Sequence, residues 1–573
     1  MSKDFISYIS SSQKKIFPDD VPCKNFEYGT ALKNEPFSIT LAYKTIETAC
    51  LPVSVYVKCD GLDISIYKIG FVPVTHPESV CNGVASEDKG AGLYPDMLLK
   101  RKTTPELIKK EHFGTIHYEN NEKNTLNATC SAMQSVLITF NENGKDVKPG
   151  IYDIEISVCN NSTLEVVGNH KFTLKIIDQN LPETELMYTN WFHYDSLADI
   201  HGVELYSEKY FQIFKKYISN ATKFRMNTLL IPAFTPPLDT FRGEERTNSG
   251  VVKIKREGQN YQFDFSELER IIKIASDCGI SYFEHPHFFT QWGAEHAPNI
   301  YADDNGTYKR IFGWETDATG DEYKAFLNAY IPAFLKFAKE MNIDDKLFFH
   351  ISDEPNVQHE ESYKKAVELV SNLLKDYKSG DALSSVKYYN NGLVKIPIVQ
   401  IDNADNFFGK CDSFWLYYTG GYYPATSNVH KCSNRLLSSK PYCTRILGLH
   451  LYKYKTSGFL HWGYNFYYDK MCKGIFDPKA DACGYKQMPG ASYLAYPGIN
   501  EPIPSLREKY MCEAMDDYRA LKALEKFIGY DEVIKLCNSF FGEEVSCFTI
   551  PDGEDKMIAF REMINNEIEK RTV

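Results

Sequence analysis

The chain has 573 residues, a formal net charge of −12 at pH 7, 43% hydrophobic residues and 24% charged residues. A chain of this length forms more than one domain, and an acidic chain without clustered Lys and Arg is a poor nucleic-acid partner. It has no run of 18 apolar residues, so no membrane insertion is expected. The N-terminal residues lack the apolar run of an export signal, and the 15 cysteines include no CxxC pair. These features predict a cytoplasmic location with reduced thiols.

The first third of the chain alternates apolar and polar residues with the period of two that is typical of β-strands. The clearest segments are Pro36–Tyr43, Pro52–Lys58, Ser135–Phe140, Gly150–Val158 and Lys171–Ile177, with turn-forming residues between them. Little of this region has helical periodicity. Residues 1–180 are therefore predicted to form a β-sandwich.

After a short polar link, apolar strand-like runs alternate with amphipathic helical stretches, a pattern that indicates βα units around a parallel sheet. The expected helices include Phe265–Gly279, Asp321–Asn342 and Glu360–Lys378. Eight strands are expected, at Leu186–Trp191, Thr228–Pro232, Ser281–Pro286, Leu347–Ser352, Ile396–Asp402, Phe414–Tyr418, Gly458–Gly463 and Tyr493–Pro497. The prediction is a multidomain α/β protein in which residues 186–503 form a (β/α)₈ TIM barrel and residues 504–573 a C-terminal helical extension packed on the barrel.

In such a barrel the active site lies where the strands end. The fourth expected strand ends in "FFHISDEPN", which places two neighbouring carboxylates, Asp353 and Glu354, at this position. Alternation turns Phe348, His350, Ser352 and Glu354 inward. Asp353 can join Glu354 only if the strand stops by about Ser352, and the proline that follows Glu354 is typical of such a turn.

Two carboxyl groups beside an aromatic-lined opening indicate glycoside hydrolysis. An ordinary retaining enzyme needs a second carboxylate after strand seven, but "FLHWGYN" has no acid before Asp469. A 2-acetamido sugar supplies its own nucleophile, because its carbonyl oxygen can attack the anomeric carbon and form an oxazoline. Glu354, kept protonated, would then be the general acid and base, and Asp353, kept ionised, would orient the acetamide N–H.

Several long motifs resemble glycoside hydrolase family 123. They are "NWFHYDSLADIHGVE", "MNTLLIPAFTPPLDT", "FFTQWGAEHAPNI", "HISDEPN", "RILGLHLYKYKTSGFLHWGYNFY" and "SLREKYMCEAMDDYRAL", and together they span about Asn190 to Leu521. The resemblance implies an N-terminal β-sandwich, a (β/α)₈ barrel and a retaining exo-β-N-acetylgalactosaminidase that uses substrate assistance and no metal. It implies terminal β-linked N-acetylgalactosamine of glycosphingolipid glycans as a substrate, and it places the family's acid pair on Asp353 and Glu354.

A sugar subsite needs an apolar platform and hydrogen-bonding groups at its rim. Each residue near a strand end could equally belong to the core. Trp415 is a weaker candidate for sugar contact than Trp292 and Trp462. The predicted substrate-binding residues are His193, Asp195, Trp292, Tyr417, Trp462, Tyr464 and Asn465. His285 and His287 share a strand face but have no third ligand in a motif, so neither a metal nor another cofactor is expected.

Two other functions stay open from the residues alone. One is a glycosidase with a protein carboxylate as nucleophile, for which Asp402, Asp412 or Asp469 would have to approach Glu354. The other is a non-catalytic carbohydrate-binding barrel. The choice of N-acetylgalactosamine over N-acetylglucosamine follows from the resemblance only, and the residues do not indicate an oligomeric state.

Overall fold

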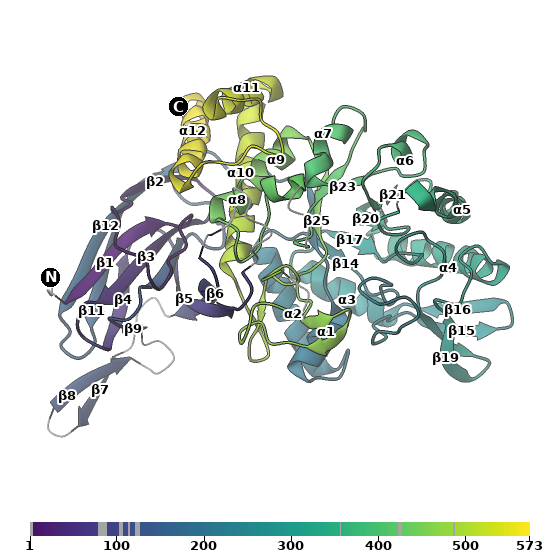
Figure 1. Ribbon diagram of the computed structural model, residues 1–573, viewed down its shortest axis with the longest axis horizontal. Coiled ribbons are helices and arrows are strands. Elements are labelled where there is room, and N and C mark those ends of the chain that lie inside the picture. Colours follow the sequence, from purple (N-terminus) through teal and green to yellow (C-terminus); the bar gives the residue numbers. More distant parts are fainter. Residues whose placement is uncertain are drawn as a thin grey trace.

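The computed structural model describes residues 4–77, 87, 89–101, 107–112, 115–120, 126–355, 357–421, 427–484 and 488–572. A strand-rich N-terminal region lies beside a larger region of alternating strands and helices, and the C-terminal helices lie over the junction between them (Figure 1).

The N-terminal region contains two five-stranded sheets. One has the order β1 (Phe5–Ser11), β3 (Phe37–Thr45), β10 (Gln134–Phe140), β5 (Ile64–Val74), β6 (Gly92–Arg101). The other has the order β2 (Tyr28–Leu32), β12 (Val166–Ile177), β11 (Gly150–Asn160), β4 (Leu51–Lys58), β9 (Leu126–Ala128). Alternate residues of both sheets, such as Leu41 and Ile156, meet in one buried core. The prediction of a strand-rich region is confirmed, and β7 (Leu107–His112) and β8 (Thr115–Asn120) add a hairpin.

The second region is built on a parallel sheet. Among the described residues its order is β21 (Lys378–Ser379), β20 (Leu347–Phe349), β17 (Tyr282–His285), β14 (Thr228–Leu230), β13 (Met187–Asn190), β25 (Gly458–His461), β24 (Trp415–Tyr417), β23 (Ile398–Gln400), β22 (Ala382–Leu383). The two edge strands, β21 and β22, are separated in the chain by Gly380 and Asp381 alone. The sheet is therefore curled, and its strands all end at the same rim.

Seven of the eight predicted segments supply strands of this sheet, and the eighth prediction is wrong. Within Tyr493–Pro497 only β28 (Tyr496–Pro497) is a strand, and it pairs antiparallel with β29 (Pro502–Ile503). This run is apolar because it is buried, and a short apolar run does not by itself distinguish a strand from buried coil. Lys378–Leu383 pairs with both β20 and β23 instead, but Gly380 and Asp381 interrupt its apolar pattern.

Helices cover the outer face of the curled sheet. They are α1 (Tyr194–His201), α2 (Glu208–Lys223), α3 (Ser266–Asp277), α4 (Asp321–Glu340), α5 (Glu360–Val370), α6 (Lys387–Asn390), α7 (Ala404–Phe407), α8 (Pro441–Arg445) and α9 (Leu447–Lys453). The predicted helices at α3 and α4 are confirmed, and α5 ends earlier than expected. The loops that follow β14, β17 and β25 contain smaller strands. They are β15 (Lys253–Glu257), β16 (Asn260–Asp264), β18 (Ile300–Asp304), β19 (Thr307–Phe312), β26 (Tyr468–Lys470) and β27 (Lys473–Ile475).

The C-terminal part forms α10 (Leu506–Ile528), α11 (Tyr530–Phe541) and α12 (Glu554–Thr572). Helix α10 begins with a capping box, in which Ser505 Oγ accepts from Glu508 N and Glu508 Oε2 accepts from Ser505 N. It is buried along nearly its whole length, because Leu506 and Tyr510 pack against the first N-terminal sheet while α8 and α9 cover it elsewhere. None of the helices in the described ranges has the length and hydropathy that a membrane span needs.

Candidate active site

Strand β20 ends at Phe349, before the acid pair. Phe348 belongs to the cluster inside the curled sheet, and Phe349 and Ile351 belong to the core under the helices, so the predicted alternation is confirmed. Beyond the strand, Phe289 N donates to Ile351 O at 3.0 Å and Trp292 N donates to Asp353 O at 2.9 Å. The segment that follows β20 therefore runs beside the loop after β17 without forming a regular strand.

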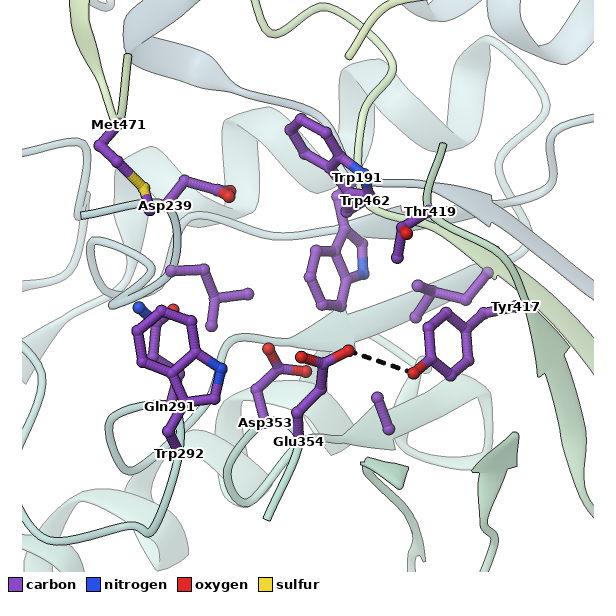
Figure 2. A pocket seen from close by; sticks show the side chains of 13 residues that line it. Trp191, Asp239, Gln291, Trp292, Asp353, Glu354, Tyr417, Thr419, Trp462 and Met471 are labelled. Carbon is purple, nitrogen blue, oxygen red and sulfur yellow. Dashed lines mark hydrogen bonds between the residues drawn. The ribbon is translucent and has the colours of Figure 1, made fainter. Parts of the chain in front are cut away.

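Asp353 and Glu354 line one wall of a pocket at the rim of the sheet (Figure 2). The pocket has an empty volume of about 710 Å³, which includes open space at its mouth. Asp353 is partly buried and Glu354 is exposed within it. Its lining consists of Trp191, Leu238, Asp239, Gln291, Trp292, Asp353, Glu354, Ala382, Tyr417, Thr419, Leu460, Trp462 and Met471. Asp353 thus points to the pocket and not into the helix layer.

Four lining residues have backbone conformations that side-chain-bearing residues rarely adopt. The φ angles are 44° at Glu354, 55° at Asp239, 57° at Trp292 and 43° at Met471. Such conformations cost free energy and persist only where the surrounding structure enforces them, and they are concentrated at functional sites. The strain here falls on one carboxylate of the pair and on the loops that face it.

The pocket is electrostatically negative, because the described residues that line it include three carboxylates and no Lys, Arg or His. Burial raises the pKa of Asp353 well above its usual range, and the charges of Glu354, Asp381 and Asp239 raise it further. Burial also raises the pKa of Asp239 to about 6, with contributions from Asp195 and Glu354 against the opposing effect of Arg246. The ligand-free site therefore favours a proton on Asp353, whereas the sequence-based prediction had Asp353 ionised.

Three predicted substrate-binding residues lie in the pocket. Trp292 and Trp462 present indole rings to it, and Trp292 is 49% exposed. The Tyr417 hydroxyl donates to Glu354 Oε1 at 3.1 Å (Figure 2). This bond orients the Glu354 carboxylate within the pocket.

Three other predicted residues do not line the pocket but form a buried cluster with Arg246 behind it. Arg246 Nε and Nη2 donate to the Asp195 carboxylate, both at 2.9 Å, and Arg246 Nη1 donates to Leu238 O at 3.1 Å. Asn465 bonds the backbone of His193 through its Oδ1 at 2.8 Å and its Nδ2 at 3.0 Å. These four residues, His193, Asp195, Arg246 and Asn465, are called the buried cluster below.

The pKa values in the buried cluster follow from this pairing. Burial acts to raise the pKa of Asp195, but the Arg246 guanidinium outweighs burial and lowers it. Burial and Arg246 lower the pKa of His193 to about 4, and its Nε2 lies 2.9 Å from the Trp462 carbonyl oxygen. The cluster contacts two walls of the pocket, through the carbonyl oxygens of Leu238 and Trp462.

Tyr464 is also outside the pocket. Its side chain is 1% exposed, and its hydroxyl accepts from Asn220 Nδ2 at 3.0 Å and donates to Tyr217 O at 3.1 Å. Trp415 is core too, since its ring lies 4.4 Å from that of Phe348 inside the sheet. Tyr464 follows strand β25 and Trp415 is the first residue of β24, and both are buried by neighbouring segments in a way that is not visible in the sequence.

Polar pocket residues that the sequence reasoning missed are Asp239, Gln291 and Thr419. Asp239 is the one acid in "FTPPLDT", the stretch that follows the second strand, and Gln291 precedes Trp292. Their position after predicted strands was therefore the sequence feature that could have identified them as pocket residues. The alternative nucleophiles Asp402, Asp412 and Asp469 do not line the pocket.

The histidines considered as metal ligands face different surroundings. His285 Nε2 lies 2.9 Å from Tyr330 Oη on the helix side. His287 stacks on His350 inside the sheet, with ring centroids 4.6 Å apart and planes inclined by 23°. Ligand atoms of His287, His350 and Asp381 lie within 4.8 Å of one another. Because a histidine binds a metal in the plane of its ring, two nearly parallel stacked rings are a poor chelating pair.

A family model identifies the family to which this chain belongs, and one solved structure of that family has the same fold. The family model described as glycoside hydrolase 123, catalytic domain, matches residues 191–524. A solved structure of a family 123 glycoside hydrolase from Clostridium perfringens, described in connection with glycolipid glycan hydrolysis, has a TM-score of 0.71 at 14% identity, with 99% of this chain and 97% of that chain covered. At this identity the likeness shows a shared fold.

More distant similarities carry no argument about this chain. A maltogenic α-amylase from Thermotoga neapolitana has a TM-score of 0.31 at 11% identity, covering 58% of this chain and 76% of that chain. A β-D-glucuronidase from Dictyoglomus thermophilum has a TM-score of 0.29 at 11% identity, covering 89% and 68% respectively. No curated protein matches the chain.

Proposed function

The chain belongs to glycoside hydrolase family 123, and from this premise we propose that it is a retaining exo-β-N-acetylgalactosaminidase acting by substrate assistance. Its substrate would be a glycan with a terminal, non-reducing β-linked N-acetylgalactosamine, such as a glycosphingolipid oligosaccharide. The observation that carries the proposal is the adjacent pair Asp353 and Glu354 on one wall of the aromatic pocket.

Adjacent carboxylates suit substrate assistance better than either ordinary mechanism. Inverting and retaining glycosidases need their two carboxyl groups on opposite sides of the scissile bond, with the sugar between them. Residues 353 and 354 share one short turn and one wall, so they cannot enclose a sugar ring. Both can reach the same side of a 2-acetamido sugar, where the glycosidic oxygen and the acetamide group are close together.

In the proposed reaction Glu354 gives its proton to the glycosidic oxygen as the bond to the anomeric carbon breaks. The acetamide carbonyl oxygen attacks that carbon. Asp353 accepts a hydrogen bond from the acetamide N–H and stabilises the positive charge of the forming ring. Glu354 then takes a proton from the water that opens the oxazoline. Because the free site favours the proton on Asp353, the arriving N–H group would shift that proton to neighbouring Glu354.

The remaining lining residues suit a sugar ring. The indole rings of Trp191, Trp292 and Trp462 offer apolar faces, and Asp239 and Gln291 offer hydrogen-bonding groups away from the pair. We assign these polar groups to ring hydroxyls. The preference for galactosamine over glucosamine rests on the family and not on a contact in this pocket.

One observation supports a second candidate mechanism. Asp239 is a third carboxylate in the pocket, separate from the pair, and it replaces Asp402, Asp412 and Asp469 as the candidate nucleophile. An aryl 2-deoxy-2-fluoro glycoside distinguishes the mechanisms, because a carboxylate nucleophile would retain the sugar as a covalent adduct that peptide mass spectrometry locates on Asp239. Substrate assistance predicts no adduct and strong inhibition by an oxazoline-mimicking thiazoline.

The fold supports a matching domain division. We propose residues 1–180 as a β-sandwich, residues 186–503 as a (β/α)₈ barrel and residues 504–573 as a helical extension. Pairing of Lys378–Leu383 with β20 on one side and β23 on the other supports closure of the barrel through this interrupted fifth strand. The buried contacts of α10 make it integral to the fold and not an addition to the surface.

The test of the function is a panel of aryl β-N-acetylgalactosaminide, β-N-acetylglucosaminide and β-galactoside with the wild-type enzyme. Turnover of an acetamido sugar, with little of the plain galactoside, is the expected result. Preference for the galactoside would refute substrate assistance, and no turnover of any of the three would favour a non-catalytic carbohydrate-binding protein.

A further inference from the structure

The turn that carries the acid pair is held by the interrupted fifth strand. Strand β21 ends at Ser379 and β22 begins at Ala382, so Gly380 and Asp381 form a break between them. Gly380 N donates to Phe349 O, the last residue of β20, at 3.1 Å. A Cβ at Gly380 would lie 1.9 Å from Ile396 O, so the close approach of the next strand requires glycine at this break.

The break lets a side chain take the place of backbone partners. The Asp381 carboxylate is fully buried, and it accepts from Ile351 N through Oδ1 at 2.8 Å and from Ser352 N through Oδ2 at 3.1 Å. Had the fifth strand continued regularly, its carbonyl groups would have bonded the fourth strand and kept it straight. The carboxylate instead satisfies the two N–H groups just before the pair, while the chain turns.

Two further contacts make this support specific. The Tyr363 hydroxyl of α5 donates to Asp381 Oδ2 at 2.6 Å and fixes the orientation of the carboxylate. Glu354 N donates to Ala382 O at 3.1 Å, so the residue after Asp381 holds the strained acid itself. The backbone on both sides of Asp353 is thus anchored to two consecutive residues, 381 and 382.

We propose that Asp381 is the positioning residue of the catalytic pair: through the N–H groups of Ile351 and Ser352 it keeps the chain in the turn that brings Asp353 and Glu354 to the same wall of the pocket. Its charge also lies behind Asp353 and contributes to the proton affinity of that carboxylate. The proposal deepens the proposed function, since it rests on the roles given there to the pair.

The loss of the Asp381 charge should be measurable as a change in the pKa of Asp353. Asp353 faces three negative groups, Glu354, Asp381 and Asp239, and the charge of Asp381 acts to raise the pKa of Asp353. Asp381 itself faces His350, whose Nδ1 lies 3.9 Å from Asp381 Oδ1. Burial raises the pKa of Asp381 to about 7, against His350, Tyr363 and the two backbone donors, which lower it.

The test is Asp381→Asn, with Asp376→Asn as the matched control because Asp376 is an exposed acid shortly before the same strand. We expect kcat to fall on the order of 100-fold, because a small displacement of the catalytic groups has an effect of this size. KM should change by less than about 3-fold, since the three tryptophans assigned to the sugar come from other loops. The pH limb set by the free pair should move to lower pH, because a negative charge behind Asp353 is lost. The control should match wild type.

The kinetic assays use whichever aryl glycoside the wild-type enzyme cleaves, so a wrong substrate assignment leaves this test intact. A crystal structure of Asp381→Asn needs no substrate at all. We expect residues 351–354 to leave the present turn and Glu354 to lose its bonds to Ala382 and Tyr417. An unchanged turn, or unchanged kcat and pH limb in a folded variant, would overturn the proposal.

A second variant decides the matter if Asp381→Asn does not fold. Tyr363→Phe removes one hydrogen bond to Asp381 and leaves the bonds to Ile351 and Ser352 in place. A kcat lowered by about 3- to 10-fold, with a shifted pH limb, supports the proposal, since one typical hydrogen bond has about this net worth. Wild-type kcat and pH dependence in Tyr363→Phe would contradict it.

Discussion

The pocket and the buried cluster behind it are both built from polar residues that follow strands of the same sheet, yet they treat charge in opposite ways. In the buried cluster, Asp195 is matched by Arg246 in a two-bond ion pair, and its pKa is lowered. In the pocket, the carboxylates have no cation among the described lining residues, and the pKa values of Asp353 and Asp239 are raised.

This difference separates structural polar groups from reactive ones. A buried charge contributes to a stable fold when a partner compensates for its lost hydration, as Arg246 does for Asp195. A carboxylate that must gain and lose a proton during a reaction cannot be neutralised permanently in this way. The backbone repeats the contrast, because left-handed conformations occur at Glu354, Asp239 and Trp292 in the pocket but at none of the four cluster residues.

The largest effect is expected from the pair itself. Glu354→Gln and Asp353→Asn should each lower kcat by about 10²- to 10⁴-fold, because each removes a group that exchanges a proton or stabilises charge during the reaction. Thermal unfolding should show no loss of stability, since each variant removes a negative charge from a negative pocket. Asp412→Asn is the matched control, as an exposed acid outside the pocket. Activity near that of wild type in either variant would remove the pair from the mechanism.

The buried cluster should respond in stability. Arg246→Met leaves the charge of Asp195 buried without its partner, and we expect a loss of about 3–5 kcal/mol in the free energy of unfolding, measured by urea denaturation. The double variant Arg246→Met with Asp195→Asn should recover part of this loss. If the single variant were as stable as wild type, the ion pair would not be what holds the loop at Leu238.

Aromatic residues in the two regions should give complementary results. Trp292→Ala, at an exposed pocket position, should raise KM about 10-fold and leave the melting temperature unchanged, because one sugar-stacking face is lost. Tyr464→Phe should lower stability by about 1 kcal/mol through its lost hydrogen bonds and leave KM unchanged. Enzyme kinetics with calorimetry measures both, and a KM effect in Tyr464→Phe would return that residue to the substrate site.

The smallest effect concerns pH and the third carboxylate. The pKa of Asp239 is raised to about 6 in the folded protein, so the stability that it contributes is present at low pH and is lost as pH rises through about 6. Asp239→Asn removes this loss. The variant should therefore unfold at a higher temperature than wild type above pH 6 and lose that advantage toward pH 4, in thermal scans across this range. A constant difference at every pH would show that Asp239 does not titrate there.

Local pattern predicted much of the fold, because strands such as β14, β20 and β24 are short and mainly apolar. The strand predictions failed where an apolar run is buried without pairing in the sheet, and where a segment pairs in the sheet without being an apolar run. Tyr493–Pro497 is apolar because it is buried, although it is not a strand of the sheet. Lys378–Leu383 supplies two short sheet strands with a glycine and an aspartate between them. The same break supplies Asp381, which no pattern in the sequence marks as part of the site.

The sequence by itself determined that Asp353 and Glu354 follow a strand whose alternate side chains face inward. It also determined that the chain must turn before the pair, because side-chain alternation would otherwise point the two carboxylates to opposite faces. Only the tertiary structure decided which polar residues beyond the other strands reach the pocket. His193, Asp195, Tyr464 and Asn465 are buried outside the pocket, whereas Asp239 and Gln291 line it. The physical reason is that the alternation of side-chain direction applies only within a strand. Beyond the strand, the direction of each loop is set by contacts with distant residues such as Arg246 and Asp381.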